Sequence, residues 1–196
     1  MNNHGVGICA NNLTSTFDSG AVGTPVTFIR RKALNCTDFA DVCRVIVEAK
    51  RTVSCNFMAA SAQGRAADLE TTPERTFILE PEGGIVTHAN HMVVGAQYCT
   101  NKGTKFRDKV LRRLLSERRG AIDIPYIMEC MKNHEIFPGA VPTTCREAVC
   151  THVPCENYDP DQTWKTIASA VYDLSNGAAY ICKGNPCVGE YTRYAL

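Results

Sequence analysis

The stretch NNHGVGICANNL, residues 2–13, predicts the first core strand of this protein. Small and apolar residues fill its centre, as in a strand that is buried on both faces. A second stretch, Thr87-His88-Ala89-Asn90-His91, stands at the end of another predicted strand. Each stretch puts an asparagine, Asn2 or Asn90, beside a strand end.

The rest of the sequence consists of segments with a helical period and segments with a strand-like period. Helices begin where capping residues precede an apolar stripe of period 3.6, and strands are bounded by glycine-rich turns. Asn176-Gly177 is a strong signal for a two-residue hairpin turn. The predicted elements are strand 5–13, helices at 25–34 and after Thr37-Asp38, strands 55–62, 66–71, 76–79 and 85–88, helices from Thr104 to Gly120 and from Asp123 to Met131, and a hairpin of 165–174 with 178–182.

Strands and helices come in runs in this order, with two helices between single or grouped strands. Parallel sheets need strands and helices in strict alternation, which the chain lacks. The order therefore predicts an α+β fold with antiparallel sheets and helices packed outside them. We expect residues 1–196 to form a single domain.

The composition excludes several classes of partner. Hydrophobic residues make up 44%, charged residues 21%, and the formal net charge is +1, so neither a nucleic acid nor a membrane is an expected partner. No apolar run approaches the ~20 residues that span a bilayer. There are 11 cysteines and no charged-then-apolar leader, and we therefore expect the cytoplasm as the compartment.

The segment His88-Ala89-Asn90-His91 allows three interpretations. Its H-x-x-H spacing could contribute to a metal site, but such a site needs at least three ligands, and no acidic residue stands beside the pair. The second interpretation is a strand-end loop with hydrogen-bonded histidines. In the third, the Asn90 side-chain amide is a preorganised donor for a developing oxyanion.

The irregular segment from Pro138 to Gln162 holds several cysteines. Their spacing is C-x4-C-x4-C, looser than the pairs that structural zinc sites favour. Free thiols are the main interpretation, with a disulfide or a zinc site as alternatives, and the same holds for a second loose pair. The residues concerned are Cys145, Cys150 and Cys155 with His152, and Cys182 with Cys187.

Arg146 follows the first of these cysteines in a non-helical stretch. An arginine in a loop is usually solvated, but its fixed fork of donors could also orient a carboxylate or a carbonyl. Gly83-Gly84 lies in a predicted hairpin turn and lacks the surroundings of a phosphate-binding loop. The sequence therefore predicts no cofactor and no bound metal.

Several segments, taken in order, resemble one family over nearly the whole chain. They are Asn2-Asn3-His4-Gly5-Val6, Gly23-Thr24-Pro25, Ala59-Ala60-Ser61-Ala62 before Asp68-Leu69-Glu70, Thr87-His88-Ala89-Asn90-His91, Thr143-Thr144-Cys145-Arg146 and Gly184-Asn185-Pro186-Cys187. The family is that of acyl-coenzyme A:6-aminopenicillanic acid acyltransferase (isopenicillin N acyltransferase), peptidase family C45. It is a branch of the N-terminal nucleophile (Ntn) hydrolases and is similar to the choloylglycine hydrolases.

The resemblance implies an αββα sandwich, in which two antiparallel sheets lie between helical layers. It implies self-cleavage before a cysteine whose thiolate then attacks a small-molecule amide or acyl thioester, with its own α-amino group as the base. Asn90 and Asn2 match the asparagines that hold the oxyanion, and Arg146 matches an arginine associated with the active site. The acyl group passes from the enzyme to water or to an amine.

The family's nucleophile and cleavage site lie upstream of the strand that opens this chain. Cys9 is inside that strand and does not match the nucleophile. We therefore expect the chain to be the C-terminal portion of the Ntn fold, incomplete at its N-terminus, with the missing N-terminal segment as its partner. The alternative is a binding protein that kept the fold and lost the nucleophile.

Overall fold

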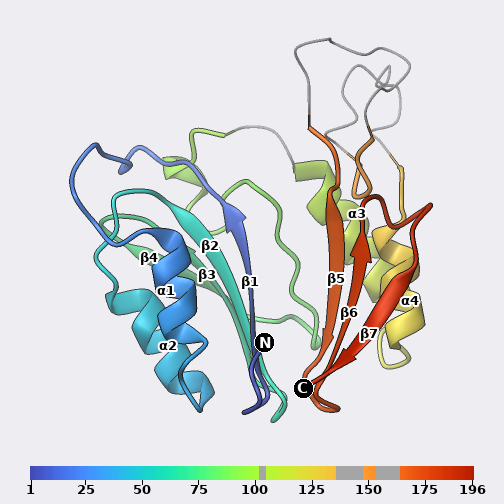
Figure 1. The fold of residues 1–196 in the computed structure, drawn as a ribbon. Helices are drawn as coiled ribbons and strands as arrows, with labels where there is room; N and C mark the ends of the chain where they lie inside the picture. Colours follow the sequence, from blue (N-terminus) through green and yellow to red (C-terminus); the bar gives the residue numbers. More distant parts are fainter. Residues whose placement is uncertain (102–104, 136–147, 153–163) are drawn as a thin grey trace. The chain divides into compact units, whose positions relative to one another are not determined.

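The computed structural model describes residues 1–101, 105–135, 148–152 and 164–196. In these residues the chain has an α+β fold with two antiparallel sheets and four α-helices (Figure 1). The prediction of an α+β fold with antiparallel sheets is confirmed. The chain divides into two compact units, Met1–Lys102 with Leu174–Gly177 and Leu196, and Gly103–Asp173 with Ala178–Ala195. Each unit is described by itself.

The first unit contains a four-stranded sheet in the order β1-β2-β3-β4. All neighbouring strands are antiparallel, and the register pairs Val6 with Ser61 and Asn12 with Cys55. Gly64, in the turn between the second and third strands, has a φ of 80°, which favours glycine. The strands are β1 (Val6–Asn12), β2 (Cys55–Ser61), β3 (Ala66–Thr71) and β4 (Thr76–Leu79), close to their predicted positions.

Helices α1 (Val26–Ala33) and α2 (Phe39–Glu48) cover one face of this sheet (Figure 1). The Asp38 side chain caps α2 as predicted, accepting a hydrogen bond of 2.9 Å from the backbone N–H of Asp41. The pair Thr24-Pro25 predicts Thr24 as the cap of α1 and Pro25 as its first residue. This prediction is wrong, because Pro25 occupies the cap position without a side-chain bond. The apolar faces of both helices and of β1 to β3 form the core of the unit.

The predicted strand at 85–88 is also wrong. Only an isolated bridge between Glu82 and Ile85 forms there among the described residues. The backbone carbonyls of His88 and Ala89 instead accept hydrogen bonds of 3.0 and 2.8 Å from the side chain of Asn11. A side chain of β1 thus takes the place of a strand ladder. A short 3-10 helix, η1 (Ala96–Tyr98), follows.

The second unit contains a three-stranded antiparallel sheet in the order β5-β6-β7, with helix α4 against β5. Asp123 caps α4 as predicted, accepting a bond of 2.8 Å from the Tyr126 N–H. The third strand was not predicted, since it is mostly exposed and shows no apolar alternation. The elements are α3 (Lys105–Glu117), α4 (Ile124–Met131), β5 (Ala168–Asp173), β6 (Ala178–Lys183) and β7 (Tyr191–Ala195).

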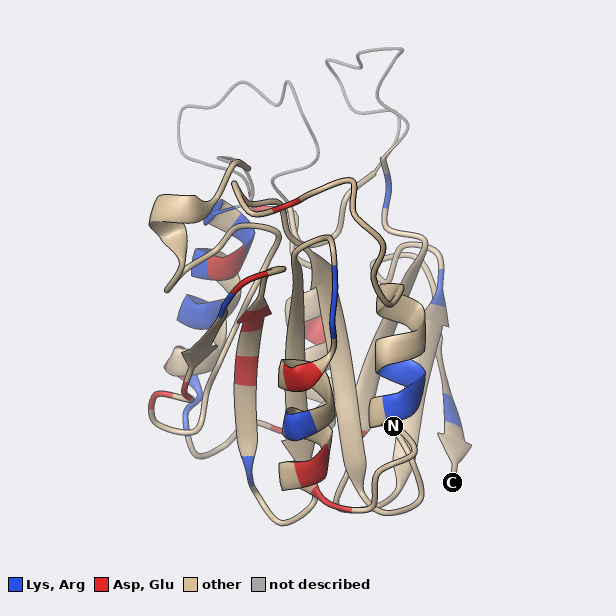
Figure 2. Ribbon diagram, turned by 90° about the vertical axis from the view of Figure 1, so that its left-hand side faces the viewer, with Lys and Arg blue, Asp and Glu red and all other residues tan. Residues whose placement is uncertain are grey.

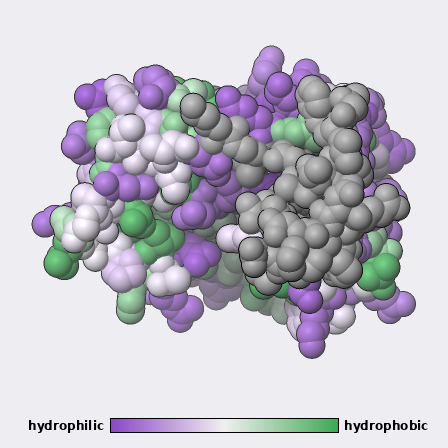
Figure 3. Space-filling view, turned by 90° about the horizontal axis from the view of Figure 1, so that it is seen from above, coloured by the Kyte–Doolittle hydropathy of each residue, from purple (hydrophilic) through white to green (hydrophobic). Residues whose placement is uncertain are grey.

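The surface of the described residues is mixed in polarity. On the face that Figure 3 shows, small hydrophobic patches alternate with hydrophilic residues. Within the described ranges, no helix has the length and apolar character that crossing a membrane requires.

Substitution of Phe57 tests how much the core of the first unit contributes to stability. Its side chain on β2 is 0% exposed within the core cluster, so Phe57→Ala should lower the free energy of unfolding by about 3–5 kcal/mol. The matched control is Phe28→Ala on α1, because Phe28 is 66% exposed and its loss should change stability by less than about 1 kcal/mol. Urea unfolding measures both variants. Equal losses would contradict the position of this core.

Candidate functional site

A buried carboxylate on β3 organises the segment that carries Asn90. The side chain of Glu70 is fully buried. Its Oε1 lies 3.0 Å from Nε2 of His88 and also accepts a hydrogen bond from the backbone N–H of Val93. Its Oε2 accepts bonds of 3.1 and 2.8 Å from the N–H groups of Val94 and Gly95. One acid thus holds both ends of residues 88–95.

A second acid, Asp68, lies on the same face of β3, because side chains two positions apart in a strand share a face. In Figure 2 the acidic residues of this strand are red bands on the ribbon. The Asn56 side chain donates a hydrogen bond of 2.6 Å to Asp68, whose other oxygen lies 3.7 Å from Nε2 of His88. Both acids lie in a stretch that carries the resemblance to the family, but nothing in the sequence indicates that they contact His88.

The contacts shift the pKa of both main partners toward the charged forms. Burial alone raises the pKa of Glu70, but His88 and the N–H groups of Gly95 and Val93 outweigh it and lower the pKa below 4.5. Burial alone lowers the pKa of His88, but Glu70 and Asp68 outweigh it and raise the pKa above 6.5. The two side chains therefore form a buried ion pair at mildly acidic pH.

Asn90 lies at the end of β1. Its Nδ2 donates a hydrogen bond of 3.0 Å to the backbone carbonyl of Asn12. Its own carbonyl accepts a bond of 2.8 Å from the Asn101 side chain. Together with the two bonds from Asn11 that replace the strand ladder, these contacts fix the side-chain amide of Asn90 beside Asn12.

Asn2 has a different setting, before the start of β1. Its Nδ2 donates bonds of 3.0 and 2.9 Å to the carbonyls of Leu34 and Cys36, between the two helices. Its Oδ1 accepts bonds of 3.0 and 3.1 Å from the N–H groups of His4 and Val6. The amide of Asn2 thus joins the start of β1 to the α1–α2 connection.

The structure does not bring Asn2 and Asn90 together. They lie beyond opposite ends of β1, whose seven residues at about 3.4 Å each span roughly 20 Å. It is Asn12, which the sequence did not single out, that lies beside Asn90. Arg146 falls outside the described residues. The catalytic roles of Asn2, Asn90 and Arg146 stay predictions.

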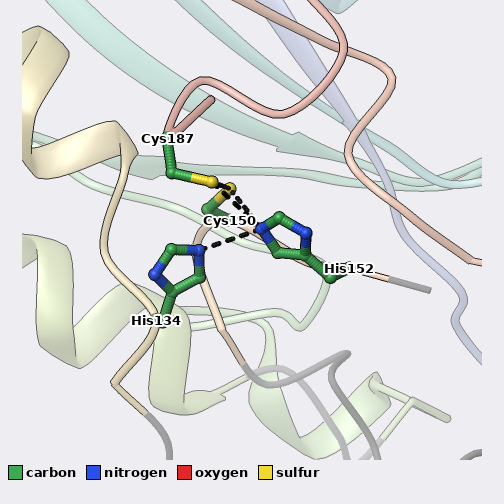
Figure 4. A group of neighbouring side chains, drawn as sticks. All are labelled: His134, Cys150, His152 and Cys187. Atoms are coloured by element: carbon green, nitrogen blue, oxygen red, sulfur yellow. Dashed lines mark hydrogen bonds between the residues drawn. The ribbon is translucent and has the colours of Figure 1, made fainter. Parts of the chain in front are cut away.

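A second cluster of reactive side chains lies in the second unit (Figure 4). His134, Cys150, His152 and Cys187 each direct one potential ligand atom into the same small volume. Cys182, which the sequence paired with Cys187, is buried within β6 and is not part of the cluster. The cysteines at 145 and 155 lie outside the described residues.

Comparisons with known proteins agree with the fold. The family model described as acyl-coenzyme A:6-aminopenicillanic acid acyl-transferase matches residues 1–121. Two solved structures, a mutant and a variant of conjugated bile acid hydrolase from Clostridium perfringens, have TM-scores of 0.52 and 0.54 at 14% identity. The matched regions cover 98% and 99% of this chain and 75% of the chain in each of the two structures. No curated protein sequence matches the chain.

Glu70→Gln tests the buried ion pair. The substitution removes the negative partner of His88, and breaking a buried pair should lower the free energy of unfolding by about 3–5 kcal/mol. The lowered pKa of Glu70 contributes stability above pH 4.5 that is lost as the pH falls through the folded-state value. The raised pKa of His88 contributes stability below pH 6.5 that is lost as the pH rises through the folded-state value.

The difference in stability between wild type and Glu70→Gln should therefore be largest between pH 4.5 and 6.5 and narrow on either side. Chemical unfolding across this range measures it. Glu82→Gln, on an exposed turn residue, is the control and should leave the pH profile unchanged. A difference that does not vary with pH would refute the ion pair.

Proposed function

This chain belongs to the acyl-coenzyme A:6-aminopenicillanic acid acyl-transferase family, and on that premise we propose that it carries the oxyanion-binding part of a cysteine amide hydrolase or acyltransferase. Family and fold support amide hydrolase or acyltransferase chemistry in general. The proposal adds the nucleophile, an N-terminal cysteine supplied by a segment upstream of Met1 in the natural protein and exposed by self-cleavage.

In the proposed reaction the cysteine sulfur attacks the carbonyl carbon of an amide or acyl thioester, and its α-amino group takes the thiol proton. The carbonyl oxygen becomes an oxyanion. As the intermediate collapses, the bond to the leaving amine or thiol breaks, and the proton passes to that group. Water or an amine then attacks the carbonyl carbon of the acyl-enzyme and gives up a proton of its own to the α-amino group. The bond between the carbonyl carbon and the cysteine sulfur breaks, the acyl product leaves, and the α-amino group passes that proton to the thiolate.

The observation that carries the proposal is the fixed amide of Asn90. An oxyanion donor is effective when the protein holds it in place before the charge develops. The Asn12 carbonyl holds the Asn90 side chain, and the buried Glu70 holds the segment around it. We assign Asn12 as its neighbour at the site, because the end of β1 places the two residues side by side. Asn2 supports the start of β1.

The substrate we propose is an N-acyl amino acid or a related small amide. The matching structures are those of a hydrolase of conjugated bile acids, whereas the family is named for acyl transfer. Both reactions pass through the same acyl-enzyme and differ in the acceptor. The cytoplasm is the proposed compartment, because no disulfide joins the cysteines in the described part of the chain, as is usual where thiols are kept reduced.

A second candidate is a homologue that binds the same class of small molecule without turning it over. Fold does not determine function, so a member of this family can keep the fold and bind a small molecule without catalysis. The N-terminus of the natural protein decides between the two candidates. Intact mass and N-terminal sequencing of the protein from its source should give a chain that begins with cysteine. A natural product that begins at Met1 would favour the binding protein.

Asn90→Ala tests the oxyanion role in the self-processed natural protein. The substitution should lower kcat by about 10²–10³, the usual loss for one oxyanion donor, with little change in KM. The assay measures release of amino acid from a panel of N-acyl amino acids, with acyl-coenzyme A and an amine as the transfer assay.

Asn3→Ala is the matched control, because Asn3 is exposed before β1, and it should keep wild-type kcat. Thermal unfolding shows whether Asn90→Ala remains folded. A folded Asn90→Ala protein whose kcat falls less than threefold would remove Asn90 from the mechanism.

A further inference from the structure

We propose that His134, Cys150, His152 and Cys187 bind one zinc ion in a tetrahedral Cys2His2 site within the second unit. The four ligand atoms all lie within 4.8 Å of one another. In Figure 4 the four side chains converge from separate segments of the chain. The proposal concerns the stability of the second unit and does not rest on the proposed catalytic function.

The distances from Nε2 of His152 to the other three ligand atoms, and the distance between the two sulfurs, lie within about 0.5 Å of those around a single tetrahedral ion. Zinc bonds of about 2.3 Å to sulfur and 2.0–2.1 Å to nitrogen imply separations of about 3.8 Å between sulfurs, 3.4 Å between nitrogens and 3.6 Å between sulfur and nitrogen. The two Sγ atoms are 3.7 Å apart, and the two Nε2 atoms are 3.0 Å apart. Nε2 of His152 lies 3.5 and 3.1 Å from the sulfurs of Cys150 and Cys187.

The surrounding backbone holds the ligands in this arrangement. The N–H of Cys150 donates a bond of 2.9 Å to the carbonyl of Asn133, next to His134. The Asn185 side chain donates bonds of 3.3 Å to the Cys150 sulfur and 2.7 Å to the Thr151 carbonyl. An N–H donor to a ligating sulfur stabilises its thiolate form, and such supporting contacts are typical of metal sites.

The donor set selects the ion. Two thiolates and two imidazoles at tetrahedral spacing are the ligands of structural zinc, whereas calcium and magnesium require oxygen ligands. On binding, each cysteine thiol releases its proton to solvent, and two thiolate charges neutralise the charge of Zn²⁺. The resulting site carries no net charge, which suits the buried position of Cys150.

A disulfide between Cys150 and Cys187 is the competing use of the same sulfurs. A disulfide needs sulfurs about 2.05 Å apart, and it would leave the two imidazoles without a role. The sulfurs lie at 3.7 Å, with Nε2 of His152 close to both. This arrangement matches metal ligation and not a sulfur–sulfur bond.

Binding the ion would connect three segments of the second unit. His134 follows α4, Cys150 and His152 precede β5, and Cys187 lies between β6 and β7. His134 and His152 are 18 positions apart, and Cys150 and Cys187 are 37 positions apart. An ion that closes such loops contributes its binding free energy to folding.

The first test is metal content. Elemental analysis of the purified protein should find about one zinc per chain. After replacement by cobalt, the visible spectrum should show the intense bands of tetrahedral Co²⁺ and a thiolate-to-cobalt charge-transfer band. Removal of zinc with a chelator should lower the thermal unfolding midpoint, and added zinc should restore it.

Substitution of single proposed ligands tests where the zinc ion binds. Cys150→Ser and His152→Asn should each reduce bound zinc at least tenfold, whereas Cys36→Ser and His4→Asn in the first unit should keep one zinc per chain. The wild-type cobalt spectrum tests the proposal even where a variant fails to fold. Absence of zinc and of a cobalt spectrum from folded wild-type protein would overturn the site. An intact mass 2 Da low with a mapped Cys150–Cys187 disulfide would also overturn it.

Discussion

The first unit depends on one buried carboxylate. A fully buried acid is costly unless charged or hydrogen-bonding groups surround it, and Glu70 has both, in the ring of His88 and the backbone N–H groups of Val93, Val94 and Gly95. All of these partners come from one segment. If this segment moved away from β3, the buried carboxylate would lose all of these partners. The contacts with Glu70 therefore fix the position of Asn90 within the segment.

Most of the fold could be predicted from local rules. The turn at Gly64, the capping residues Asp38 and Asp123 and the Asn176-Gly177 pair are signals within a few residues of sequence, and each lies at an observed turn or helix start. The hairpin at Asn176-Gly177 forms, but residues 174–177 connect its strands, so the connection has four residues and not the predicted two. The failures have non-local causes. The segment 85–88 is held by the side chains of Asn11 and Glu70 and not by a strand ladder. β7 is an exposed edge strand, which leaves no apolar alternation to detect.

The candidate sites were less predictable, because their contacts join distant positions. Asn90 could be singled out from its own stretch, but its neighbour Asn12 is 78 positions away. Sequence proximity suggested pairing Cys187 with Cys182, whereas β6 buries Cys182 and the turn after it brings Cys187 to Cys150. Resemblance to a family assigned Asn2 to the same site as Asn90, yet the length of β1 separates them.

The topology of the first sheet also orders its assembly. β2, β3 and β4 are joined by short turns, so they form a meander at a small entropy of loop closure. β1 pairs with β2 only after the chain has closed around both helices, and the bond from Asn90 to Asn12 closes a still longer loop. A folding intermediate in which β1 has not yet paired with β2 would contain β2, β3 and β4 but would lack the bond from Asn90 to Asn12. We therefore expect the candidate site to be among the last features to form during folding.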